Sequence, residues 1–178
     1  MPMLVGPNQC SFVPRRHVTD NMVIGQEIFH SMHKKKGKSS FMAVKVYLEK
    51  AYDRLRFTDQ FLQFDSFLCF FYPYACSFNG VPLDEFSPSK GVRQGDLISP
   101  YLFVLCIERF AYLIEREIAY NNWKSIKLCK IGHFISHLFF VDDLLLFGKA
   151  SITQIDIINN CLDVFCSSSR QKVSLAKT

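Results

Sequence analysis

Three segments of the chain have the pattern of α-helices, and shorter runs of alternating apolar and polar residues lie between them. The helical segments cover residues 19 to about 34, 99 to about 120 and 153 to about 168. Ser99 and Pro100 open the second segment as a cap residue followed by proline in the first turn. The positions expected to face the core are Phe103, Cys106, Ile107, Phe110, Leu113, Ile114 and Ile118 in the second segment, and Ile157, Ile158, Cys161, Leu162 and Phe165 in the third.

The alternating runs predict short strands. In residues 41–48, FMAVKVYL, the two faces hold Val44, Val46 and Leu48 on one side and Lys45 and Tyr47 on the other. A further strand is expected within residues 123–130. Residues 56–78, rich in phenylalanine, are expected to begin as a helix and to continue, extended, into a hairpin turn at Asn79–Gly80. Together these elements predict an α+β fold in which a small antiparallel sheet is backed by helices.

Composition narrows the class of protein. The chain has 178 residues, of which 49% are hydrophobic, so we expect one structural unit with a sizeable core. A net charge of +5 suits a polyanionic partner such as nucleic acid without requiring one. Seven cysteines without CxxC spacing, no signal peptide and no apolar tract of about 20 residues predict an intracellular protein. We expect it to be nuclear or cytoplasmic, not secreted and not membrane-bound, with free cysteines.

One spacing suggests zinc and is rejected. Cys129, His133 and His137 lie four residues apart, as ligands on one face of a helix would. The alternating apolar residues around them predict a strand instead. Along a strand such neighbours are separated by about 13 Å, which is too far to share one zinc ion.

Two adjacent carboxylates interrupt the most apolar run of the chain. Asp142 and Asp143 lie in the middle of SHLFFVDDLLLFG, between two expected strands. A turn exposed to water is one explanation, because Asp is common at hairpin tips. Further upstream, GVRQGDLISPYLF places Gln94 between Gly91 and Gly95 in a loop that feeds directly into a helix. Such glycines allow a ligand to approach the backbone closely, and the glutamine can hydrogen-bond a base or a sugar.

With these motifs the sequence resembles the reverse transcriptases of LINE-type (non-LTR) retrotransposons, particularly those of plants. Five segments match in the family's order: residues 8–21 (NQCSFVPRRHVTDN), 46–55 (VYLEKAYDRL), 91–103 (GVRQGDLISPYLF), 139–147 (FFVDDLLLF) and 167–178 (SSSRQKVSLAKT). The resemblance implies a polymerase palm in residues 41–178 and part of the fingers in residues 1–40, without a thumb or the upstream fingers. It also implies RNA-directed DNA polymerisation with Mg²⁺, or Mn²⁺ as an alternative, from dNTPs on an RNA template with a DNA primer.

The resemblance assigns roles residue by residue. Asp142 and Asp143 match the carboxylates that bind two metal ions together with a third Asp from the first palm strand, and both count as catalytic. Tyr52 matches the residue that selects the sugar, or is simply a core aromatic, and Gln94 and Gly95 match the loop that positions nucleotide and template. Arg16 matches a fingers arginine that binds nucleotide or template, or is a surface charge. Lys177 matches the lysine that protonates pyrophosphate.

The sequence departs from the family at several positions. Tyr47 stands where the family has the metal-bridging Asp, and Glu49 is not expected to replace it. Arg15 and Arg170 stand where the family has glycine. We therefore predict a degenerate fragment without polymerase activity. The alternatives are a non-catalytic remnant that binds nucleic acid or a protein, and an unfolded product with no role.

Overall fold

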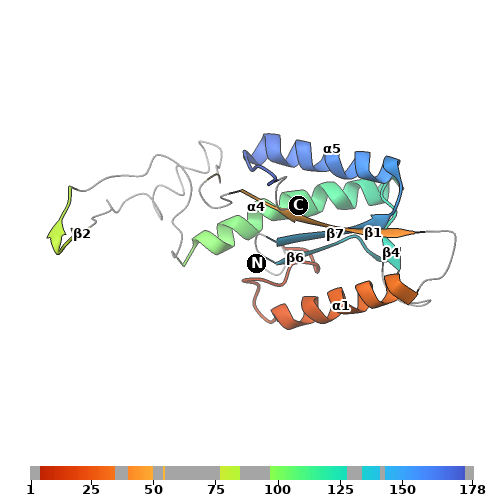
Figure 1. Ribbon diagram of the computed structural model, residues 1–178, viewed down its shortest axis with the longest axis horizontal. Coiled ribbons are helices and arrows are strands. Elements are labelled where there is room, and N and C mark those ends of the chain that lie inside the picture. The colour runs from red at the N-terminus through yellow and green to blue at the C-terminus, as the bar shows by residue number, and fades with distance from the viewer. Residues whose placement is uncertain are drawn as a thin grey trace.

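A three-stranded antiparallel sheet forms the centre of the protein (Figure 1). The computed structural model describes residues 5–34, 40–49, 54, 77–84, 97–127, 134–140 and 143–174. The strand order is β1–β7–β6, so β7 is the central strand. The bounds are Phe41–Tyr47 for β1, His137–Phe140 for β6 and Asp143–Lys149 for β7. β1 and β7 pair over seven consecutive residues, from Phe41 opposite Lys149 to Tyr47 opposite Asp143.

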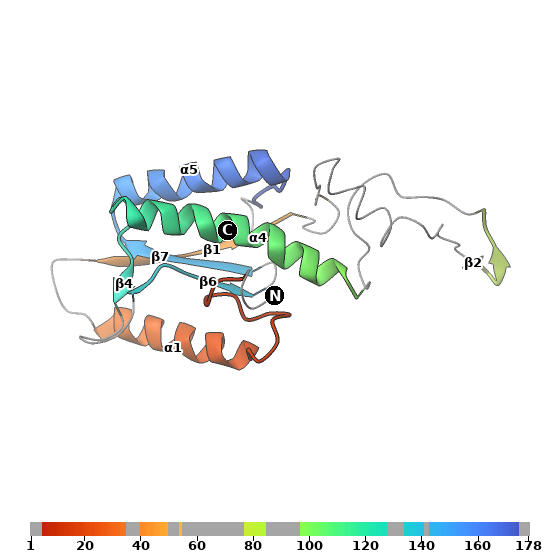
Figure 2. The ribbon, with the colours of Figure 1, turned by 180° about the vertical axis from the view of Figure 1, so that it is seen from behind.

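Helices cover both faces of this sheet (Figures 1 and 2). Two of them, α4 and α5, pack against one face, and α1 packs against the other. Their bounds are Val18–Lys34 for α1, Ser99–Ala119 for α4 and Ile152–Ser169 for α5. This arrangement confirms the prediction of helices packed on a small antiparallel sheet.

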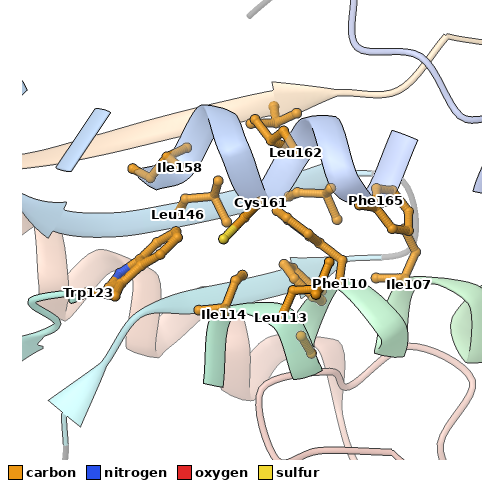
Figure 3. Close-up of a cluster of buried hydrophobic side chains, with 14 of the residues drawn as sticks. Ile107, Phe110, Leu113, Ile114, Trp123, Leu146, Ile158, Cys161, Leu162 and Phe165 are labelled. Atoms are coloured by element: carbon orange, nitrogen blue, oxygen red, sulfur yellow. The ribbon is translucent and has the colours of Figure 1, made fainter. Parts of the chain in front are cut away.

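The main core lies between the sheet and the pair α4 and α5 (Figure 3). Phe110 of α4 is fully buried at its centre. Its ring stacks on Phe139 of β6 at 5.8 Å and contacts Phe165 of α5 at 5.1 Å between ring centroids. The predicted stripes of both helices therefore face the core, with Cys106, Ile118 and Ile157 only partly buried.

The cap residue of α4 and the first residue of α5 differ from the prediction. Ile98, not Ser99, is the N-cap of α4. Ser99 lies inside the first turn, and its hydroxyl is buried without a hydrogen-bond partner among the described residues. The predicted cap was therefore wrong, although Pro100 does lie in the first turn. α5 begins at Ile152 because the Ser151 hydroxyl accepts a hydrogen bond from the backbone N–H of Gln154.

Two short hairpins complete the described part of the chain. Asn79 and Gly80 both have positive φ, 50° and 81°, as a tight hairpin turn requires, which confirms the predicted turn. Most of the predicted helix before this turn lies outside the described residues. The bounds of the paired strands are Ser77–Phe78 for β2, Val81–Pro82 for β3, Ile126–Lys127 for β4 and Phe134–Ile135 for β5.

Candidate active site

Tyr47 and Asp143 meet at one end of the sheet. They are the last residue pair of the β1–β7 ladder, directly opposite each other. Side chains in that relation have Cβ atoms about 5 Å apart. Because β7 is central, Asp143 also has a neighbour on its other side, Phe140 of β6. Asp142, the other carboxylate of the predicted metal site, lies outside the described residues.

A lysine that the sequence analysis did not assign a role joins this pair. Lys45 lies two residues before Tyr47 on β1, so both side chains project from the same face of the sheet. Its Nζ is 3.2 Å from Oδ2 of Asp143 and 4.4 Å from the centroid of the Tyr47 ring. The predicted alternation of β1 already placed Lys45 beside Tyr47, but nothing in the sequence pointed to the ion pair.

The ammonium of Lys45 and the carboxylate of Asp143 form an ion pair. A hydrogen bond to Tyr47 raises the pKa of Lys45 above its ordinary value; desolvation opposes the shift, and Asp143 adds to it. The ammonium therefore stays protonated at neutral pH. Both partners of the ion pair are about two-fifths exposed, 42% for Lys45 and 41% for Asp143. An exposed pair of this kind stabilises the fold by less than about 1 kcal/mol, so its significance lies in the local charge.

Glu49 does not join the pair. One of its carboxylate oxygens accepts a hydrogen bond from Nη2 of Arg54 at 3.4 Å and lies 4.0 Å from Nζ of Lys172. Its backbone N–H donates to the Lys172 carbonyl at 2.7 Å, next to an isolated antiparallel bridge between Val173 and Leu48, the residue that follows β1. The Glu49 carboxylate therefore has its own cationic partners.

The described residues do not fit a divalent metal ion. No group of three or more His, Cys, Asp or Glu side chains that could hold a metal occurs among them. At Asp143 an ammonium already contacts the carboxylate, and the residue opposite is a phenol. Of the rejected zinc ligands only His137 is described. Burial lowers the pKa of His137 to about 4.

A loop before α1 lies along the outer edge of β6. Gln9 forms a parallel bridge with Phe139, and the backbone N–H of Phe139 donates to the carbonyl of Asn8 at 3.0 Å. The amide of Asn8 also contacts Nε2 of His137 at 3.3 Å. A bridge of one residue leaves no pattern in the sequence, so the sequence analysis missed this contact.

Arg16 holds that loop together. Its guanidinium donates hydrogen bonds to three backbone carbonyls of the loop, those of Val5 at 3.0 Å, Gly6, and Gln9 at 2.7 Å. These contacts give Arg16 a structural task, and its predicted contact with a template stays a prediction. The other predicted site residues, Tyr52, Gln94, Gly95 and Lys177, lie outside the described residues.

Arg15 and Arg170, the two arginines that the resemblance places at glycine positions, share a conformation. Arg15 has φ 67° and Arg170 has φ 58°. Both values lie in the left-handed region, which glycine adopts readily and other residues adopt at a cost. Arg170 is the residue at which α5 ends. At both positions the backbone has a conformation that suits glycine.

The chain belongs to the reverse transcriptase (RNA-dependent DNA polymerase) family, which it matches over residues 1–178. It is 33% identical over 86 residues to a retrovirus-related Pol polyprotein from a type-2 retrotransposable element of Drosophila melanogaster, covering 48% of this chain and 7% of that protein. Recognition of a LINE-type (non-LTR) retrotransposon reverse transcriptase domain from the sequence is thereby confirmed.

A second relative is more similar over a shorter stretch. The chain is 42% identical over 65 residues to an uncharacterized mitochondrial protein of Arabidopsis thaliana, covering 36% of this chain and 53% of that protein. The chain therefore spans about half the length of this relative and a small part of the Drosophila polyprotein. No helix within the described residues is long and apolar enough to span a membrane.

Proposed function

We propose that this chain is a retrotransposon reverse transcriptase domain whose catalytic centre is disabled at position 47. The observation that carries the proposal is the β1–β7 register, which sets a tyrosine directly opposite Asp143. In the five-motif match, the first palm strand supplies an Asp at that position and the hairpin supplies the other carboxylates. This register supports the assignment of Tyr47 to the position of that Asp.

The replacement removes the chemistry that polymerisation needs. Two-metal nucleotidyl transfer requires a cluster of carboxylates that binds Mg²⁺ or Mn²⁺. A phenol has an ordinary pKa near 10 and is neutral at pH 7, so it cannot neutralise a dication as a carboxylate does. Glu49 does not supply the missing charge, because its carboxylate already contacts Arg54 and Lys172. The loss of one metal ion lowers the rate of the chemical step by a factor of about a thousand or more.

The finer architecture follows from the same match. We assign residues 41–178 to the palm and residues 1–40 to part of the fingers, forming one unit through the contacts of α1 with the sheet. The partners of the parent activity are an RNA template, a DNA primer and dNTPs. In this assignment Asp142 and Asp143 are the carboxylates that would bind the metal ions.

Primer extension with Mg²⁺ and dNTPs tests the proposal. The unmodified chain should give no product, and Tyr47→Asp should give measurable extension. Tyr47→Asn is the matched control, because Asn has nearly the shape of Asp without its charge, and it should remain inactive. Adding Asp143→Asn to Tyr47→Asp should abolish the gain. Robust synthesis by the unmodified chain would overturn the proposal, as would a Tyr47→Asp variant that gains neither extension nor Mn²⁺ binding.

A further inference from the structure

The ammonium of Lys45 lies beside the carboxylate of Asp143. Its Nζ lies 3.2 Å from Oδ2 of Asp143, within the range of a direct ion pair. The same Nζ lies 4.4 Å from the centroid of the Tyr47 ring, so the ammonium has two partners at once. Lys45 and Tyr47 project from one face of β1, and Asp143 is opposite Tyr47, which makes Lys45 its diagonal neighbour.

We propose that Lys45 is the resident counter-ion of Asp143 and excludes divalent cations from this end of the sheet. This inference rests on the proposed function, because it concerns the same end of the β1–β7 pair. It adds that the site is occupied by a cation of the protein's own. Restoring metal affinity then depends on the charge at position 45 as well as on the ligand at position 47.

The charges around Asp143 explain why a divalent cation should bind weakly there. Lys45 and Asp143 form an ion pair at 3.2 Å, and the side chain of Tyr47 offers a phenol where a second carboxylate would be needed to leave a net negative charge. A dication approaching Asp143 loses the attraction of a free carboxylate and is repelled by the ammonium. At a separation of about 5 Å in water-like surroundings, this repulsion lowers the affinity for a dication on the order of tenfold. The Tyr47 ring keeps the ammonium near the carboxylate by a cation–π contact.

Binding of Mn²⁺, measured by the loss of the free-ion electron paramagnetic resonance signal at 0.1 M salt, tests the proposal without any polymerase assay. Lys45→Met should raise the affinity of the Asp143 site about tenfold, whereas Lys45→Arg, which keeps the charge, should leave it weak. Lys45→Met with Asp143→Asn should show no gain, which separates this carboxylate from other acidic groups on the surface.

Lys149→Met is the matched charge control. Lys149 is paired with Phe41 at the other end of the same ladder, six residues or about 20 Å from Asp143. That distance is about two Debye lengths at 0.1 M salt, so removing this charge should change the affinity less than twofold. Far-ultraviolet circular dichroism confirms that each variant is folded.

The outcomes separate this inference from the proposed function. Unchanged Mn²⁺ affinity in Lys45→Met would overturn it, as would an equal gain in Lys149→Met or a gain that persists with Asp143→Asn. Any of these results can coexist with extension by Tyr47→Asp, in which case the proposed function stands and the counter-ion role of Lys45 fails. A gain that depends on Asp143 supports the counter-ion role whether or not Tyr47→Asp polymerises.

Discussion

Replacing Arg170 by glycine should stabilise the protein. Arg170 ends α5 with φ 58°, a left-handed conformation that costs a residue with a Cβ about 1–2 kcal/mol. Glycine avoids this cost but loses more backbone entropy on folding, by about 0.5–1 kcal/mol. The difference predicts that Arg170→Gly raises the free energy of unfolding by about 0.5–1 kcal/mol. Arg15, with φ 67°, should behave in the same way.

Urea unfolding at pH 7 measures this gain as a rise in the denaturant midpoint at an unchanged m-value. In a chain of this size, 1 kcal/mol corresponds to a rise of about 2–4 °C in Tm. Arg170→Ala is the control, because alanine removes the guanidinium but keeps the Cβ that strains the backbone. It should give no such gain.

The comparison of the two variants shows whether the change in stability comes from the backbone conformation or from the loss of the arginine side chain. If Arg170→Gly and Arg170→Ala shift the midpoint equally, the effect comes from the guanidinium and the argument from φ is wrong. If Arg170→Gly lowers the midpoint, the arginine side chain stabilises the end of α5 by more than the backbone conformation costs. The side chain of Arg170 is exposed, which is why we expect neither result.

Two further predictions concern the loop along β6. Burial lowers the pKa of His137 from 6.5 to about 4, so the folded state binds a proton less readily than the unfolded state. The free energy of unfolding therefore does not depend on this group above pH 6.5, and it decreases by about 3 kcal/mol in total as the pH falls from 6.5 to about 4. In His137→Gln the urea midpoint should vary less with pH over this range. Arg16→Ala removes the hydrogen bonds to three loop carbonyls and should lower stability by about 1–3 kcal/mol and speed amide hydrogen exchange in residues 5–17. Arg15→Ala is the matched control, and unchanged stability in Arg16→Ala would refute the structural role.

The helices could be predicted because one face of each has to be buried. The stripe of α4 with Ile107, Phe110 and Ile114 is fully buried, and so is Phe165 of α5. The cap of α4 was less predictable. Ser99 has the residue type and the following proline of a cap, but the chain places it in a buried first turn, where its hydroxyl does not cap the helix. Tertiary burial thus overrode a local preference.

The contacts at the site were predictable only in part. The alternation of β1 placed Tyr47 on the same face as Lys45, and this prediction needed only the periodicity of the strand. The ion pair of Lys45 with Asp143 could not be predicted from periodicity, because the two residues lie almost a hundred positions apart and their contact depends on the side-chain rotamers. The task of Arg16 was missed for a similar reason, since its partners are backbone carbonyls, which every residue carries.

The β1–β7 ladder explains why position 47 cannot be compensated nearby. The two strands pair over seven consecutive residues, so the partner of Asp143 is fixed by the whole ladder. A slip of β7 by one residue would turn Asp143 toward the core between the sheet and α4, and would remove Leu144 and Leu146, which are fully buried, from that core. No small backbone adjustment can therefore bring a carboxylate opposite Asp143. The ammonium of Lys45, by contrast, can leave Asp143 by rotation of its side chain alone. Polymerase activity should consequently respond to substitution at position 47, whereas cation affinity at Asp143 should respond to position 45 as well.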